Sequence, residues 1–288
     1  MRRIIGGGSY RLVGFLSGLA LLSSLLFTFQ NCSAVKFGSV ASSSVSSGDF
    51  GHCPLQNLTT PIKVLFVVDT SGSNAQYTTH QGTSACDPKA GSCSPPTDPQ
   101  KVFRGGSISA FFNAYQAKTN FSWGFEVFSG TSASSYVSPG SFGNSQAMQS
   151  ALSQFYAEND SNGTPYIAAL DSAQSALGSD PDINSQAVHA PLYYIIFMSD
   201  GYPTDALTNM GAVDFKKIDT AIAKIIALAP SRVVLSTVYY GTINDPVAAS
   251  TLQNMASAGN GQFVNVDTSA TNSIVIDDLI TIPAGQCQ

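Results

Sequence analysis

The chain has 288 residues, which suits one large domain or two small ones, and 43% of them are hydrophobic, enough to fill a core. Thirteen basic side chains against eighteen acidic ones leave a net charge of −5, and only 11% of the residues are charged, against roughly 25% in an average soluble domain. Because binding to a phosphate backbone needs clustered Lys and Arg, this composition excludes general nucleic-acid binding.

Residues 1–31 predict an export signal rather than a part of the fold. Arginines near the start precede an apolar run from Leu12 to Phe29, and polar residues follow it, which is the arrangement of a secretory signal. The single Cys32 directly after this region resembles the end of a bacterial lipoprotein signal, where the cysteine becomes the lipidated N-terminus. A plain signal peptide or an uncleaved membrane anchor is the alternative, since the run is long enough to span a bilayer.

The lipoprotein interpretation also predicts where the protein lies. Lipidation of Cys32 would anchor an exported chain in the cell envelope, and Ser33 in place of Asp favours the outer membrane, facing the periplasm or the cell surface. Residues 32–52 are mostly Ser and other small residues, which bury too little apolar area to fold, so we expect a flexible tether. Removal of residues 1–31, which hold three Arg and no acid, changes the net charge to −8.

The four cysteines that follow the first one predict disulfide bonds. Four cysteines allow three pairings, and we expect Cys86–Cys93 within one loop and Cys53–Cys287 between the two ends of a domain that spans residues 53–288. A zinc site is the alternative. No cysteine pair has two-residue spacing, and the three histidines form no ligand pattern, so disulfides are favoured.

Apolar runs and helical patterns alternate along the domain. The predicted strands are 62–68, 121–128, 192–198, 233–240 and 262–266, and the predicted helices are 108–118, 147–156, 165–177, 213–228, 246–258 and a short one near 273–280. Such an alternation predicts an α/β fold with helices on both faces of a mainly parallel central sheet.

Two segments depart from this alternation. Residues 74–106 are rich in Gly, Pro, Thr and Ser, and they predict a long irregular insertion held together by the Cys86–Cys93 disulfide. A loop of that length without secondary structure is usually functional or stapled. Residues 129–144 predict a turn rich in Gly, Ser and Pro that contains a short edge strand.

Oxygen-bearing side chains follow two of the buried strands where each strand ends. Asp69, Ser71 and Ser73 come after the first predicted strand, and Asp200 comes after the third. Ligands of open α/β sheets bind beyond the carboxyl ends of the strands, near the point where the strand order reverses. Oxygen ligands without imidazole or thiolate suit a hard cation, Mg²⁺ first, with Ca²⁺ or Mn²⁺ as alternatives.

These residues resemble the metal-ion-dependent adhesion site of the von Willebrand factor A (integrin I-like) family. The family motif is D-x-S-x-S, then a Thr in a second loop, then an Asp after a later strand. Asp69, Ser71 and Ser73 match the first element, Thr164 the second and Asp200 the third. The resemblance covers about residues 61–280 and implies a three-layer, Rossmann-like fold. The insertion departs from the pattern, since the family usually begins its first helix almost at once.

The resemblance implies an adhesive function rather than catalysis. In this family an acidic side chain of the partner commonly supplies the last metal ligand, so we expect a protein or glycan partner that presents a carboxylate. A structural module of the cell envelope without functional metal dependence is the main alternative. For Asp69 and Asp200 taken singly, capping of the next turn is the simpler interpretation.

A hydrolase is the third alternative. It would use Ser84 as nucleophile and His80 as base beside Asp69. Ser84 follows Asp69 too closely for the subtilisin-like pattern that this arrangement faintly resembles, and it lies in a Pro-rich loop. A Gly-Lys loop that could bind phosphate is also missing from the sequence.

Overall fold

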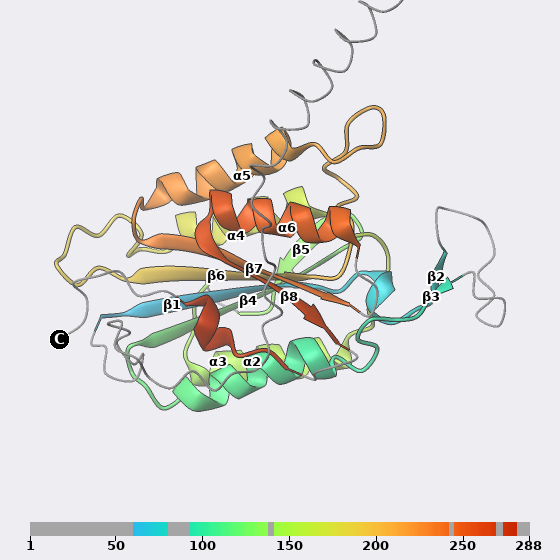
Figure 1. The fold of residues 1–288 in the computed structure, drawn as a ribbon. Coiled ribbons are helices and arrows are strands. Elements are labelled where there is room, and N and C mark those ends of the chain that lie inside the picture. The colour runs from blue at the N-terminus through green and yellow to red at the C-terminus, as the bar shows by residue number, and fades with distance from the viewer. Residues whose placement is uncertain (1–59, 80–92, 138–140, 242–244, 269–272, 281–288) are drawn as a thin grey trace, which may run out of the picture. The chain divides into compact units, whose positions relative to one another are not determined.

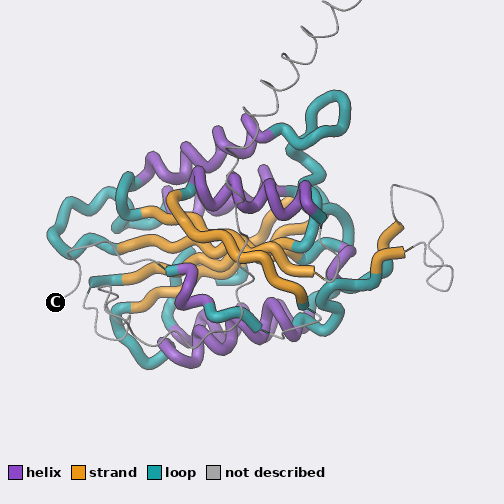
Figure 2. Tube along the Cα trace, in the orientation of Figure 1, coloured by secondary structure: helices purple, strands orange, loops and turns teal. Residues whose placement is uncertain are grey.

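The computed structural model describes residues 60–79, 93–137, 141–241, 245–268 and 273–280, all within one compact unit, residues 51–288. A six-stranded sheet lies between two layers of helices (Figures 1 and 2). The predicted α/β architecture with helices on both faces of a mainly parallel sheet is therefore confirmed.

The order of the strands places a reversal in the middle of the sheet. The strands are β1 (Ile62–Asp69), β4 (Phe121–Ser129), β5 (Ser132–Ser135), β6 (Leu192–Ser199), β7 (Val233–Gly241) and β8 (Asn260–Asp267). Their order is β5-β4-β1-β6-β7-β8, and every neighbouring pair is parallel except β4 with β5. The chain runs outward from β1 to β5 and then returns to place β6 on the other side of β1. The switch point of the sheet thus lies between β1 and β6.

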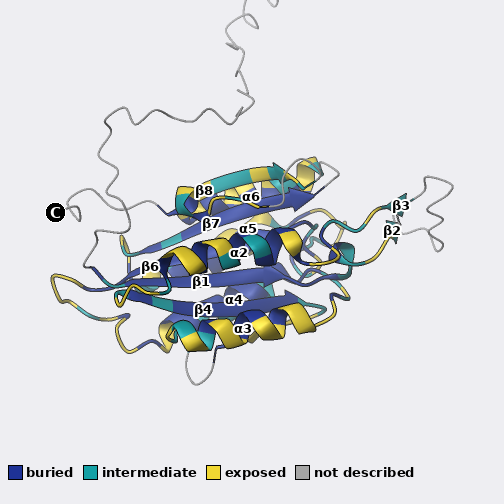
Figure 3. Ribbon diagram, turned by 90° about the horizontal axis from the view of Figure 1, so that it is seen from below, coloured by how far each residue is buried: buried dark blue, intermediate teal, exposed yellow. Residues whose placement is uncertain are grey.

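The helices divide between the two faces. The helices α2 (Val102–Tyr115) and α3 (Ser145–Ala157) cover one face, and α4 (Tyr166–Gly178), α5 (Phe215–Leu228) and α6 (Pro246–Ala258) cover the other (Figure 1). Alternate side chains of β1 explain this arrangement. Phe66 and Val68 pack with the α2 and α3 side chains, whereas Leu65 and Val67 pack with those of α4, α5 and α6. All residues of β1 and β6 are buried, and Figure 3 shows these central strands as the core.

Most predicted elements are confirmed with ends within two residues of the predicted ones, and the edge strand expected within residues 129–144 is β5. The helix predicted near 273–280 is a single 3₁₀ turn, Ile276–Leu279. Helix α2 begins at Val102, six residues before the predicted start. The side chain of Asp98 accepts hydrogen bonds of 3.0 Å from the N–H groups of Phe103 and Arg104, so it caps a first turn whose two glycines weaken the helical pattern.

The predicted irregular insertion is wrong in part. Its end, from residue 102 onward, belongs to α2, and a short antiparallel hairpin of β2 (Thr78–Thr79) and β3 (Cys93–Ser94) lies within it. The hairpin projects away from the sheet (Figures 1 and 3). Cys93 is disulfide-bonded, and its partner lies outside the described residues, so the Cys86–Cys93 pairing stays a prediction.

Several other predictions fall outside the part of the chain that the structure describes. They are the leader 1–31, the tether 32–52, the lipidation of Cys32, and the Cys53–Cys287 pairing. Across the described ranges, none of the helices has the length and apolarity that a membrane span requires.

Candidate metal centre

The switch point brings together the two strand ends that carry carboxylates. Asp69 is the last residue of β1, and Asp200 directly follows the last residue of β6. The two strands are parallel neighbours, with Val68 opposite Met198. Both carboxylates therefore lie at the same edge of the sheet, where open α/β sheets bind their ligands.

A chain of hydrogen bonds connects four of the five predicted site residues. The N–H of Ser71 donates to Oδ1 of Asp69 at 2.7 Å, and the hydroxyl oxygens of Ser71 and Ser73 lie 3.1 Å apart. The hydroxyl of Ser73 donates to Oδ1 of Asp200 at 2.9 Å. The bond from Ser71 to Asp69 caps the turn after β1. Capping, the alternative to metal binding, therefore applies to one oxygen of Asp69 but not to Asp200.

The fifth residue, Thr164, lies against the loop that follows β6. Its N–H donates to the hydroxyl of Thr204 at 3.1 Å, and its carbonyl accepts from the N–H of Thr204 at 2.9 Å. A Cβ atom on Gly201 would lie 3.0 Å from Oγ1 of Thr164, so glycine at this position permits the close approach. The hydroxyl of Thr164 thus lies beside Gly201, the residue next to Asp200, whereas hydrogen bonds connect the other four predicted residues directly.

Burial and like charge both act on the two carboxylates. Burial, followed by the charge of Asp200, raises the pKa of Asp69 to about 7. Burial also raises the pKa of Asp200, although hydrogen bonds from Thr97 and Ser73 act in the opposite direction. Among the described residues, no Lys or Arg forms an ion pair with either carboxylate. The charge of Arg104 lowers the pKa of Asp200 without a direct ion pair, and a cation bound between the two buried carboxylates would favour their charged forms.

The donor atoms fit a hard cation rather than zinc. They are two carboxylates and three neutral hydroxyls, and oxygen ligands of this kind suit Mg²⁺, Mn²⁺ or Ca²⁺. Within the described ranges, no group of three or more His, Cys, Asp or Glu side chains is placed to hold a metal ion. A metal at this edge would therefore depend on Ser71, Ser73 and Thr164 as well as on the two carboxylates.

Two residues of the site were not predicted from the sequence. The hydroxyl of Ser199 donates to Oδ2 of Asp69 at 2.5 Å, and the hydroxyl of Thr97 donates to Oδ2 of Asp200. The position of Ser199 in the sequence could have indicated its role, because it is the last residue of a buried strand and directly precedes Asp200. No feature of the sequence indicates Thr97, because it lies in the Pro-rich insertion, 103 positions from its partner.

A buried cluster of charges lies directly behind the β1 loop. Arg104 is fully buried; its Nε donates to Asp98 at 2.9 Å, and its Nη2 donates to Asp160 at 2.7 Å. Its Nη1 also donates to the carbonyl of Asp69. The cluster thus fixes the backbone of Asp69 from the α2 side of the sheet.

A polar cavity shares two chain segments with the site. The cavity has a volume of about 480 Å³, and Ala75 and Gln76 line it a few residues after Ser73, while Asp160 and Ser161 line it just before the Thr164 loop. Gln100, Asn159 and Tyr156 are among its other lining residues.

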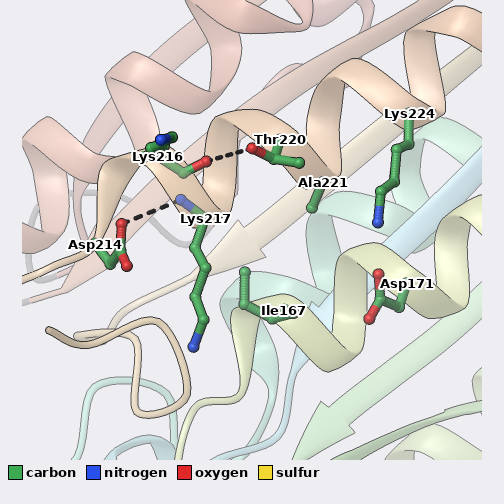
Figure 4. A pocket seen from close by; sticks show the side chains of 8 residues that line it. All are labelled: Ile167, Asp171, Asp214, Lys216, Lys217, Thr220, Ala221 and Lys224. Atoms are coloured by element: carbon green, nitrogen blue, oxygen red, sulfur yellow. Dashed lines mark hydrogen bonds between the residues drawn. The ribbon is translucent and has the colours of Figure 1, made fainter.

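A second cavity, of about 310 Å³, lies between α4 and α5 (Figure 4). Lys217 and Lys224 extend from α5 toward α4, where Asp171 lies, and the Nζ of Lys217 donates to the carbonyl of Asp205 at 3.2 Å. Its lining mixes lysines with the carboxylates of Asp171 and Asp214 and includes none of the predicted site residues. It does not form part of the candidate metal centre.

Comparison with solved structures agrees with the geometry of the sheet. The chain is similar to the structure of von Willebrand factor type A from Catenulispora acidiphila, with a TM-score of 0.50 and 14% sequence identity over 76% of this chain and 41% of that one. The fold is that of a von Willebrand factor A domain. The chain spans less than half the length of that relative, and at this identity the likeness concerns the A-domain fold alone.

Two further A-domain structures are similar at lower TM-scores. The vWF domain of the type V pili tip protein Mfa5 from Porphyromonas gingivalis has 12% identity, a TM-score of 0.48, and coverage of 77% of this chain and 94% of that one. The SpRpn10 VWA domain has 11% identity, a TM-score of 0.48, and coverage of 73% and 90%. Comparisons of the sequence with models of protein families and with curated proteins found no match.

Proposed function

We propose that this A-domain is an exported binding module that captures a protein or glycan partner through a divalent cation, Mg²⁺ first. The residues that would hold the cation are Asp69, Ser71, Ser73, Thr164 and Asp200. One observation carries the proposal: the hydrogen bond from Ser73 to Asp200 closes the site across the switch point. That bond joins the first and the last element of the motif, which no local sequence pattern requires.

The hydroxyls and the carboxylates of the site would have different roles in holding the cation. The hydroxyls of Ser71, Ser73 and Thr164 offer lone pairs without adding charge. The carboxylates of Asp69 and Asp200 supply the negative charge. Asp200 orients the hydroxyl of Ser73, and Asp69 accepts a hydrogen bond from the backbone N–H of Ser71. Bound Mg²⁺ would supply a Lewis-acidic position for a carboxylate oxygen of the partner.

The negative net charge of the chain implies that an acidic partner is attracted only at short range. Without residues 1–31 the net charge is −8, which repels an acidic partner at long range. Salt screens that repulsion beyond about 8 Å at physiological ionic strength. Attraction would therefore begin at the cation itself, and the polar cavity with Gln76, Gln100, Asn159 and Tyr156 would receive the rest of the peptide or sugar.

The leader gives the proposed location. Lipidation of Cys32 would anchor the chain in the cell envelope, with the outer membrane favoured. The tether of residues 32–52 would then connect the anchor to the domain.

Two other functions predict different results in solution. A structural module of the cell envelope would keep the fold but would not need a cation for its interaction. A hydrolase would need Ser84 and His80, both of which lie outside the described residues, and a fluorophosphonate probe should label Ser84. We favour the metal-dependent binding module because hydrogen bonds connect Asp69, Ser71, Ser73 and Asp200 at the edge where open α/β sheets bind ligands.

The test uses the full chain in detergent after removal of metal with EDTA. Calorimetric titration with Mg²⁺ should show binding that Asp200→Ala abolishes and that the matched variant Asp219→Ala, on the exposed side of α5, leaves unchanged. A pull-down from the cell-envelope fraction, with and without Mg²⁺, should recover a partner only with the wild type and the cation. A silent titration, or a partner retained in EDTA, would favour the structural module instead.

A further inference from the structure

Thr97 connects the insertion to the candidate metal site. It lies near the end of the insertion, 24 positions after Ser73, and its hydroxyl donates to Oδ2 of Asp200. The hydroxyl of Ser73 donates to the other oxygen of the same carboxylate at 2.9 Å. Both oxygens of Asp200 are therefore fixed, one from the β1 loop and one from the insertion.

The neighbouring acceptors show why this contact is the preferred one. The hydroxyl of Thr97 also lies 3.4 Å from the carbonyl of Ser73 and 3.4 Å from Oδ1 of Asn74. A hydroxyl has one hydrogen to donate, and a charged carboxylate is the stronger acceptor. The side chain of Asn74 already accepts from the hydroxyl of Tyr240 at 2.8 Å.

The backbone of Thr97 is held independently of its hydroxyl. Its N–H donates to the carbonyl of Ser73 at 3.2 Å, and its carbonyl accepts from the hydroxyl of Thr268, just after β8, at 3.2 Å. Thr97 therefore stays beside the site when its hydroxyl is removed. Its contact with Asp200 can be tested without detaching the insertion.

We propose that Thr97 is a positioning residue of the metal site, through which the insertion sets the orientation of Asp200 and so the affinity for the divalent cation. This inference rests on the proposed function, because it concerns the same site. Hydrogen-bond donors that orient a metal-site carboxylate typically change metal affinity by roughly 10- to 100-fold when they are removed. The D-x-S-x-S motif alone would then underestimate what this chain needs in order to hold its cation.

The experiment compares three variants of the full chain in detergent, with Mg²⁺ titrated by calorimetry and Mn²⁺ binding followed by electron paramagnetic resonance. Thr97→Val removes the hydroxyl and keeps the shape of the side chain, and we expect about 10-fold weaker binding of both ions. Thr97→Ser keeps the hydroxyl and should bind as the wild type does. Thr268→Val loosens the same segment without touching Asp200 and should also bind normally.

A second readout separates positioning from general stability. The melting temperature in EDTA should change little in Thr97→Val, because the side chain is only partly buried and its backbone bonds remain. If Thr97→Val folds poorly, Thr97→Ala gives the same comparison with a smaller side chain.

The outcomes are distinct. Wild-type affinity in Thr97→Val, or an equal loss in Thr268→Val, would overturn the role of the Thr97 hydroxyl while leaving the metal site intact. Failure of the wild type to bind either ion would overturn the proposed function and this inference together.

Discussion

The hydroxyl of Ser73 donates a hydrogen bond of 2.9 Å to Oδ1 of Asp200, although the two residues are 127 positions apart in the chain. This bond holds the β1 loop against the end of β6 and keeps a second carboxylate close to Asp69. Two buried negative charges then raise each other's energy, which is a stability cost that binding sites commonly carry. The first prediction follows from this proximity: removal of the repulsion between the two carboxylates should stabilise the metal-free protein and abolish its binding of Mg²⁺.

Asp69→Asn should raise the melting temperature of the metal-free protein at pH 8. The pKa of Asp69 is raised to about 7 by burial and by Asp200, so at pH 8 the side chain is charged at an energetic cost. An asparagine can accept from the N–H of Ser71 and donate to the hydroxyl of Ser199, which keeps the local bonds without the charge. If the relief is ~1 kcal/mol, the shift is about 2–4 °C for a domain of this size.

Differential scanning fluorimetry with EDTA and with Mg²⁺ measures both effects. The wild type should gain stability with Mg²⁺ through mass action, whereas Asp69→Asn should gain none. The control Asp219→Asn removes an exposed carboxylate from α5 and should leave both temperatures unchanged. A variant that loses stability in EDTA, or that still responds to Mg²⁺, would contradict this account of the site.

The contribution of Glu126 to the stability of the domain should fall as the pH rises from about 4.5 to 7. This residue lies on β4 with one carboxylate oxygen, Oε2, that has no hydrogen-bond partner in the described part of the chain. Burial raises its pKa from 4.5 to about 7, partly offset by a hydrogen bond from Ser172. The folded state therefore holds a proton that the unfolded state has already lost, and the stabilisation present below pH 4.5 disappears as the pH approaches 7, up to ~3 kcal/mol.

Glu126→Gln isolates this contribution, because a glutamine cannot ionise. Urea unfolding at pH 5 and pH 8 gives the free energy of unfolding of the wild type and the variant. The variant should be more stable than the wild type at pH 8, and this difference should be smaller at pH 5. Other buried carboxylates, Asp69 among them, titrate alike in both proteins, so only the difference between the two is used. A difference that does not depend on pH would show that Glu126 titrates normally.

Features of this fold that depend on local sequence patterns can be predicted from the sequence, whereas those that depend on contacts between distant segments cannot. The strands β1 and β6 are continuous apolar runs, and the carboxylates Asp69 and Asp200 stand at their ends, so a local pattern and a parallel sheet suffice to place both at one edge. Thr164 needed the family resemblance, since nothing in its own segment relates it to the other two loops.

The remaining features are set by tertiary contacts. The early start of α2 depends on the side chain of Asp98, which both caps the helix and pairs with Arg104. A glycine-containing first turn gives no helical periodicity from which to predict this. Thr97 reaches Asp200 only because Ser73 and Thr268 hold its backbone, and the sequence of a Pro-rich loop does not encode that geometry in any period.

Arg104→Met should destabilise the domain by about 3–5 kcal/mol, because it leaves the buried carboxylates of Asp98 and Asp160 without their shared partner. Arg232→Met provides a matched control. The guanidinium of Arg232 donates to the carbonyls of Pro191 and Ile183 rather than to a carboxylate, so its loss should cost about 1–2 kcal/mol. Urea unfolding at pH 7.5 measures both, and equal losses would mean that the buried charge cluster contributes no more than ordinary hydrogen bonds.

Gly261→Ala should destabilise the edge of the sheet, because a Cβ at this position of β8 would lie 2.1 Å from the carbonyl oxygen of Leu235 and 2.7 Å from the hydroxyl of Ser236. The pairing of β7 with β8 is irregular at this point, and the hydroxyl of Ser236 is occupied by the N–H of Gln262, so neither neighbour can move freely. We expect a loss of about 1–3 kcal/mol, the usual range for overpacking. Gly178→Ala is the matched control: it lies at the end of α4 with no atom within 4 Å of the added methyl group, and its stability should be unchanged or up to ~1 kcal/mol higher. Thermal and urea unfolding of the two variants would contradict the strand register if Gly261→Ala proved as stable as Gly178→Ala.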